Sequence, residues 1–207
     1  MQCSDNELEM TLRKAVLGAG YKFGTAVDVA RAGVWLSRRG FDGIEAILAA
    51  LQSEPAAVKL ERVNGDAVIP AAKAIAAGPA AVDLAIASDA ATRVRLDDVD
   101  SPNLVLGLAG VAAGDFSRWF TFDCDGTSIE IDFNTTSLQT VPSDCSQMTL
   151  AVGGTKVSQV ETSHSPEALL VDDENWSTIE RLAARTYVPA SEASRARGAG
   201  AGLVDTD

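Results

Sequence analysis

Two aspartates separated by one residue, Asp123 and Asp125, are the side chains of this sequence whose spacing most suggests chemistry. Both lie in the segment 119–133, where apolar residues lead into Asp-Cys-Asp-Gly-Thr. Carboxylates can act as nucleophiles, acids or bases, and their oxygens are the ligands that a hard cation such as Mg²⁺ prefers. The dipeptide Asp125-Gly126 between two alternating segments is also a strong signal for a β-hairpin turn. An active site and a hairpin are therefore alternative interpretations of the same residues.

The Asp-Cys-Asp-Gly-Thr motif resembles the nucleophile motif of haloacid dehalogenase-type phosphatases. This resemblance implies that Asp123 attacks phosphorus and that Asp125 serves as the acid and base. It also implies a lysine that binds phosphate, for which Lys156 is a candidate, and a Mg²⁺ ion held by Asp123 with Asp172 or Asp173. In this interpretation the protein is a metal-dependent hydrolase.

The residues around the motif favour the hairpin. Apolar side chains alternate with polar ones on both sides of the turn, as in half-buried antiparallel strands, at Phe120, Phe122, Cys124, Ile129, Ile131 and Phe133. The phosphatase motif normally begins a parallel sheet, whose strands need long crossover connections. The residues after Thr127 show only one convincing helix. We therefore expect a hairpin closed at Asp125-Gly126.

The histidine and the cysteines offer weaker candidates for catalysis or metal binding. His164 is the only histidine and lies in a polar turn, without the spacing of a catalytic dyad. The cysteines are Cys3, Cys124 and Cys145. Cys124 and Cys145 could meet in space, but two thiols and one histidine fall short of a zinc site. We expect buried, small side chains and no metal site.

The C-terminal segment combines two arginines, Arg195 and Arg197, with Gly198, Gly200 and Gly202. Alternate glycines let backbone amides approach a phosphate or carboxylate, and the arginines add positive charge. These five residues are the candidate ligand-binding residues, and a flexible tail is the alternative interpretation. The pattern is not a dinucleotide fingerprint, because no strand precedes it and no helix of useful length follows.

Composition limits the possible partners and location. The chain of 207 residues has 17 Lys and Arg against 29 Asp and Glu, a formal net charge of −12, which repels polyanions. We expect neither nucleic acid nor an anionic membrane as a partner. The sequence shows no secretory leader, no transmembrane stretch and an odd number of cysteines, which predicts a cytoplasmic protein.

The pattern of residues predicts a single α+β domain over 1–207. Its helical part spans 4–90, its strand-rich part 91–165, and its C-terminal helix with a Gly-rich tail 166–207. We expect an N-terminal helix capped by Ser4, followed by helices over 25–39, 44–51 (capped by Asp42), 71–88 (split at Gly78-Pro79) and 172–186. The helix over 172–186 has one apolar face, formed by Trp176, Ile179, Leu182 and Ala183. Strands of a mainly antiparallel sheet are expected over 93–96, 104–109, 118–124, 127–133, 147–152 and 156–161.

Several stretches also resemble a family of bacterial proteins known only as a domain of unknown function: Glu7-Leu-Glu, Arg13-Lys14-Ala15 and Gly18-Ala-Gly20-Tyr21 leading to Gly40, and the terminal segment 198–205. The resemblance implies one soluble unit and no established reaction. We expect a soluble cytoplasmic subunit that binds a small molecule or assists a protein partner, as a homo-oligomer and without a cofactor. A phosphatase that uses Mg²⁺ is the alternative.

Overall fold

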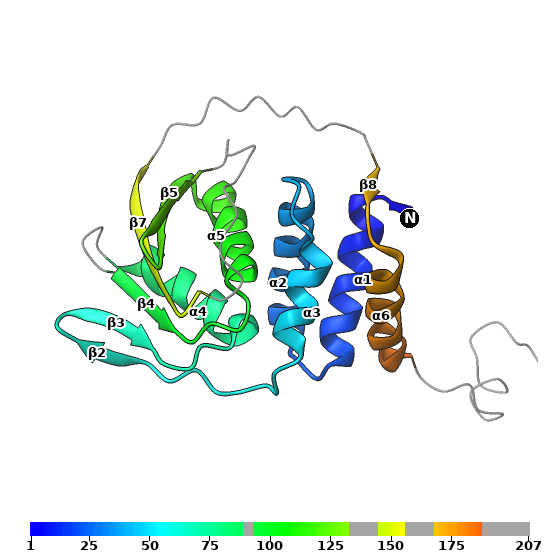
Figure 1. Ribbon diagram of the computed structural model, residues 1–207, viewed down its shortest axis with the longest axis horizontal. Helices are drawn as coiled ribbons and strands as arrows, with labels where there is room; N and C mark the ends of the chain where they lie inside the picture. The colour runs from blue at the N-terminus through cyan, green and yellow to red at the C-terminus, as the bar shows by residue number, and fades with distance from the viewer. Residues whose placement is uncertain (89–92, 133–144, 156–167, 188–207) are drawn as a thin grey trace, which may run out of the picture.

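The computed structural model describes residues 1–88, 93–132, 145–155 and 168–187. These residues form an α+β structure, as predicted, with helices first, a sheet in the middle and a helix at the end. Figure 1 shows four successive layers: the main sheet, then α4 and α5, then α2 and α3, and finally α1 and α6. The sheet therefore has helices on one side, and the outermost helix pair joins the two ends of the described chain.

Three amphipathic helices form the N-terminal part: α1 (Asp5–Gly18), α2 (Phe23–Ser37) and α3 (Gly43–Leu51). Ser4 accepts a hydrogen bond from the backbone N–H of Glu7, so it caps α1 as predicted. Asp42 accepts one from Glu45 and caps α3 in the same way. All three helices were predicted from their apolar periodicity, because each must bury one face against its neighbours.

The C-terminal part packs against the beginning of the chain. Strand β8 (Leu169–Leu170) pairs with β1 (Gln2–Cys3) in an antiparallel ladder. Helix α6 (Asp173–Ala183) and the short 3₁₀ helix η1 (Ala184–Thr186) then pack on α1. α6 buries Trp176 and Ile179, the apolar face that the sequence predicted.

The main sheet has the strand order β2-β3-β4-β7-β5-β6. Its strands are β2 (Glu61–Val63), β3 (Asp66–Ile69), β4 (Arg93–Asp97), β5 (Arg118–Cys124), β6 (Thr127–Ile131) and β7 (Gln147–Thr155). β3 and β4 run parallel because α4 (Ala74–Ala87) connects them, and the other neighbours are antiparallel. Helix α5 (Pro102–Phe116) leads from β4 to β5.

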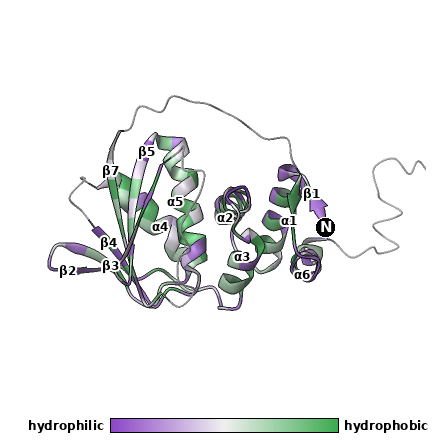
Figure 2. Ribbon diagram, turned by 45° about the horizontal axis from the view of Figure 1, so that its top comes forward, coloured by the Kyte–Doolittle hydropathy of each residue, from purple (hydrophilic) through white to green (hydrophobic). Residues whose placement is uncertain are grey.

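The sheet buries one face against α4 and α5 and leaves the other face without a described helix (Figures 1 and 2). Phe120, Phe122 and Leu150 point into the core and are fully buried. Thr121 and Asp123 alternate with them on the opposite face. Figure 2 shows the apolar positions of the sheet and of α5 in green. This alternation is typical of an antiparallel sheet with one covered face.

Three predictions about elements were wrong. Residues 104–109 belong to α5, because a continuous apolar run carries no period that distinguishes a strand from a buried helix. Residues 71–88 do not form two helices, since α4 continues through Pro79 while packed between α5 and the sheet. Strands β2 and β3 were not predicted. β2 pairs antiparallel with β3, and β3 pairs parallel with β4. The predicted strand 156–161 lies outside the described residues.

Candidate functional site

The hairpin predicted at Asp125-Gly126 is confirmed. β5 and β6 pair antiparallel, with Asp123 opposite Ser128 and Cys124 opposite Thr127. Asp125 and Gly126 both have left-handed backbones, with φ of 47° and 87°, as a type I′ turn requires. Asp123 accepts a hydrogen bond from the Gly126 N–H at 3.3 Å and is exposed. Asp125 is therefore a turn residue, and Asp123, in β5, accepts a hydrogen bond from the same turn.

The other groups that a phosphatase would need do not join this turn. Asp172 caps α6 by accepting hydrogen bonds from the N–H groups of Glu174 and Asn175. Asp173 forms an ion pair with the amino group of Met1. These carboxylates lie beside α1, in the helical layer farthest from the sheet (Figure 1). Lys156 lies outside the described residues.

The other predicted candidates are only partly covered by the structure. The glycine-rich set Arg195, Arg197, Gly198, Gly200 and Gly202 lies outside the described residues, as does His164. Among the described residues, no group of three or more histidine, cysteine or acidic side chains is placed to hold a metal ion. Cys124 and Cys145 do meet in space, and they form a disulfide, whereas Cys3 is free and buried.

A different site emerges at the carboxyl ends of the two parallel strands. Each strand leads through a short loop into a helix, β3 through 70–73 into α4, and β4 through 98–101 into α5. Binding residues are often carried by loops of this kind, which a rigid scaffold positions. Each loop contains a non-glycine residue with a left-handed backbone, Ala71 (φ 46°) and Asp98 (φ 52°). Such conformations cost about 1–3 kcal/mol each and are concentrated at functional sites.

Hydrogen bonds hold the two loops together. The backbone N–H of Ala72 donates to the carbonyl of Asp97 at 2.8 Å, and that of Asp100 donates to the carbonyl of Ala72 at 3.4 Å. The Asp100 carboxylate accepts a hydrogen bond from the N–H of Ala74 at 2.8 Å, so a residue of one loop caps the helix that follows the other. The loops therefore form one unit.

Charged and polar side chains gather on this unit. The Lys73 ammonium lies 3.9 Å from Oδ2 of Asp100, and these side chains are 36% and 13% exposed. Burial, followed by the negative charge of Asp100, raises the pKa of Tyr21, whose phenol therefore stays protonated at neutral pH. Oδ2 of Asp100 and Oδ1 of Asn103 are buried acceptors to which no described residue donates a hydrogen bond. We name Tyr21, Lys73, Asp100 and Asn103 the carboxyl-edge cluster.

The carboxyl-edge cluster was not predicted from the sequence. Its members are far apart in the chain and match no motif. Two features of the sequence could have indicated it. One is the strand-to-helix transition that ends at Asp100-Ser101-Pro102, and the other is the concentration of aspartates over 97–100. Both depend on recognising β3 and β4 as parallel neighbours, which the local pattern did not indicate.

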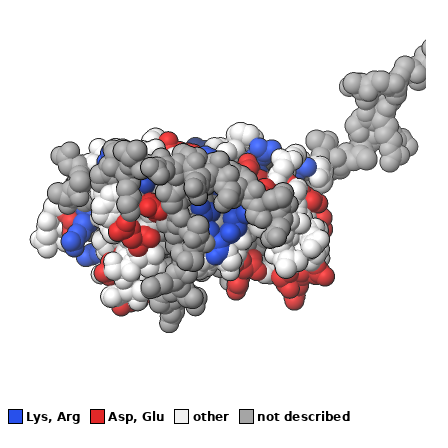
Figure 3. Space-filling model, turned by 90° about the horizontal axis from the view of Figure 1, so that it is seen from above, with Lys and Arg blue, Asp and Glu red and all other residues white. Residues whose placement is uncertain are grey.

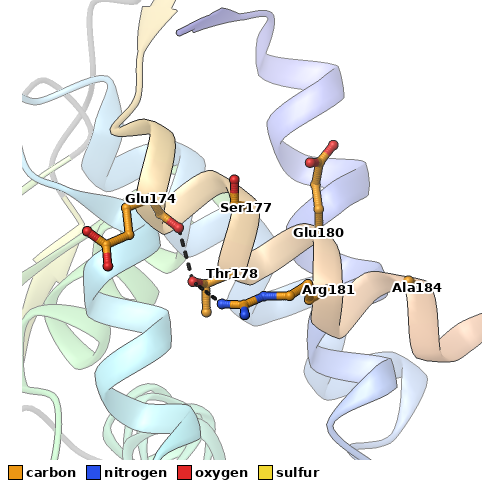
Figure 4. Close-up of a pocket in the computed structure, with 6 residues that line it drawn as sticks. All are labelled: Glu174, Ser177, Thr178, Glu180, Arg181 and Ala184. Atoms are coloured by element: carbon orange, nitrogen blue, oxygen red, sulfur yellow. Dashed lines mark hydrogen bonds between the residues drawn. The ribbon is translucent and has the colours of Figure 1, made fainter.

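A shallow hollow lies elsewhere, on the outer face of α6 (Figure 4). Its described lining comes from that helix alone, from Glu174, Ser177, Thr178, Glu180, Arg181 and Ala184. Figure 4 shows Arg181 turned back to donate a hydrogen bond to Thr178, which donates to the carbonyl of Glu174. Side chains from one helix that are hydrogen-bonded to one another do not enclose a ligand.

Comparison with known proteins links part of the chain to an uncharacterised family. Residues 3–96, from β1 to β4, match the model of a family described as "Protein of unknown function (DUF3726)", which confirms the predicted resemblance to such a family. No curated protein matches the sequence.

Among solved structures, malate dehydrogenase from Entamoeba histolytica matches with a TM-score of 0.47 and 13% identity, over 76% of this chain and 50% of that one. The chain thus spans about half the length of that structure. The similarity is too low to support an argument about fold or activity.

Proposed function

We propose that the protein is a subunit that binds a small polar molecule at the carboxyl-edge cluster. The observation that carries the proposal is that the two loops after the parallel strands, each with a left-handed non-glycine residue, meet around Lys73 and Asp100. A site of this kind needs a few fixed polar groups on a rigid frame. Here the frame consists of two adjacent strands and the helices that follow them.

The electrostatics of the cluster favour a ligand that donates hydrogen bonds. Asp100 and Asn103 each offer a buried acceptor atom, and satisfying such an atom recovers a desolvation cost of about 1–3 kcal/mol. Tyr21 supplies a protonated hydroxyl and Lys73 a positive charge. Hydroxylated or amide-bearing molecules combine the donors and acceptors that these side chains match.

A thermal-shift screen of small polar molecules tests the proposal. A ligand present at about 100 times its Kd should add about 2.7 kcal/mol of stability, which for a chain of this size raises Tm by about 5–10 °C. Asp100→Asn keeps an oxygen that can cap α4 but removes the charge beside Lys73. Lys73→Gln removes the ammonium group. Both variants should fold and lose most of the ligand-induced shift.

Arg93→Gln is the matched control, because Arg93 is exposed at the amino end of β4, the opposite end of that strand from the cluster. It should respond to ligand as the wild type does. Ligands that shift the wild type, Asp100→Asn and Lys73→Gln equally would show that binding occurs elsewhere and would refute the proposed site.

We further propose that the protein is soluble and cytoplasmic and works as an accessory subunit, either as a homo-oligomer or with a protein partner. The face of the main sheet on which no described helix packs is the surface we assign to such a partner. Among the described residues, no helix is long and apolar enough to cross a membrane. On the face shown in Figure 3, the described Lys and Arg residues stand in separate groups with Asp and Glu residues near them, which supports a partner other than nucleic acid.

A further inference from the structure

The disulfide between Cys124 and Cys145 lies at the edge of the sheet where β4 ends, and hydrogen bonds of Ser146 connect it to the loop that carries Asp100. Cys124 is the last residue of β5, and Cys145 precedes β7 by two positions. Their Cα atoms are 6.0 Å apart, within the usual range for a disulfide, and both residues are buried. The bond fixes the start of β7 to the end of β5, at the edge of the sheet where β4 ends.

Ser146 connects this disulfide to the loop after β4. Its N–H and hydroxyl donate to the two carboxylate oxygens of Asp125, at 3.0 and 3.1 Å. Its carbonyl accepts a hydrogen bond from the backbone N–H of Asp98 at 2.8 Å. Asp98 is the left-handed residue of the β4–α5 loop. Ser146, which directly follows Cys145 in the chain, therefore holds Asp98, the left-handed residue two positions before Asp100.

We propose that Cys124 and Cys145 form a redox switch that sets the conformation of the carboxyl-edge cluster. In the oxidised state the disulfide fixes Cys145 and Ser146, and Ser146 holds Asp98 in its left-handed conformation. A sparsely populated conformation persists only where its surroundings impose it. Reduction removes the covalent link between Cys145 and β5 and leaves Ser146 held by its hydrogen bonds to Asp125. With this weaker support, Asp98 relaxes more readily and the loop carrying Asp100 becomes less fixed. The regulatory meaning of this change rests on the proposed function of the cluster.

The reaction is thiol–disulfide exchange with a dithiol as reductant. One thiolate of the reductant attacks a sulfur of the disulfide and releases the other cysteine as a thiolate. The second reductant thiol, once deprotonated, then displaces the remaining cysteine. Two electrons and two protons pass from the dithiol to the protein, which gains two thiols, and the reductant becomes a disulfide. In a reducing cytoplasm, the location proposed above, disulfides are usually transient and catalytic or redox-sensing.

Hydrogen–deuterium exchange of the full chain tests the switch without any ligand. Oxidised and dithiothreitol-reduced wild type are compared, with alkylation and intact mass used to count free thiols, one in the oxidised chain and three in the reduced chain. After reduction, amides of peptides covering 97–103 and 145–148 should exchange about tenfold faster or more. Amides of α1 to α3 should not change. The Tm should fall by about 6–12 °C, since the bond closes a loop of 21 residues.

Two variants separate the switch from a general loss of stability. Cys124→Ala combined with Cys145→Ala should exchange like the reduced wild type and should not respond to dithiothreitol. Cys3→Ala, the matched control, should keep the full response, because Cys3 lies in β1 and is free. If the double variant does not fold, oxidised and dithiothreitol-reduced Cys3→Ala are compared instead.

Two results would overturn the switch. One is three free thiols at every glutathione ratio from reducing to oxidising. The other is equal exchange over 97–103 in both redox states. Failure of the proposed function is recognised separately, because Lys73→Gln and Asp100→Asn would then leave every ligand-induced Tm shift unchanged while the exchange difference remained.

Discussion

Replacing Gly18 by alanine should separate α6 from α1. Gly18 is the last residue of α1, and a Cβ built on it would lie less than 3.0 Å from the carbonyl oxygen of Leu182 in α6 and 3.3 Å from Cβ of Arg185. A backbone oxygen cannot rotate away as the end of a flexible side chain can. The methyl group is therefore accommodated only if the helices move apart.

The magnitude follows from two opposing effects. Adding a methyl group to a packed contact costs about 1–3 kcal/mol, and displacement of backbone places this contact in the upper half of that range. Alanine recovers up to about 1 kcal/mol over glycine through helix propensity. We expect the free energy of unfolding to fall by about 1–2 kcal/mol. With a urea m-value of about 2 kcal/mol/M, the midpoint shifts down by about 0.5–1 M.

Gly24→Ala is the matched control for this substitution. Gly24 lies in the first turn of α2, and a Cβ there meets no atom within 4 Å. This change should raise stability by about 0.4–1 kcal/mol, because alanine restricts the unfolded chain. Urea titrations followed by circular dichroism and by fluorescence, to which the buried Trp176 of α6 contributes, measure both variants. A Gly18→Ala protein as stable as Gly24→Ala would refute the close contact between α1 and α6.

Two further predictions concern charged side chains. Desolvation, followed by repulsion from Asp83, raises the pKa of Asp28, so the charged form is disfavoured in the folded protein and stability should rise as the pH falls through that pKa. Asp28→Asn should remove this gain in stability at low pH. Urea midpoints that change equally in wild type and variant between pH 7 and pH 4 would contradict the prediction. Asp123→Asn should leave any release of phosphate from a generic phosphomonoester unchanged and cost at most about 1 kcal/mol of stability. Loss of such activity on substitution would restore the phosphatase interpretation.

Local signals predicted the elements that local physics determines. Caps at Ser4 and Asp42 and the apolar faces of α1, α3 and α6 were visible in the sequence, because each helix carries its own period. The hairpin at Asp125-Gly126 was equally visible, since its turn type demands residues that tolerate positive φ.

The elements that were missed depend on distant partners. The run from Leu104 to Ala113 is apolar on all sides, and only burial between α2, α4 and the sheet determines that it is helical. The carboxyl-edge cluster depends on the parallel pairing of β3 and β4. Nothing in its sequence marks Ala71 as left-handed, because alanine has no preference for that conformation. The loop geometry is imposed by the hydrogen bonds between Ala72, Asp97 and Asp100.

The packing of α6 against α1 affects the order in which the chain folds. α1 can pack on α2 and α3 as soon as these helices are made, since the contacts are local. Its other side is covered by α6, which lies more than 150 residues later in the sequence. Contacts of such large sequence separation form slowly. On the ribosome, the N-terminal helices should therefore assemble early and keep one apolar side of α1 exposed until α6 emerges, which leaves that side open to non-specific association during synthesis.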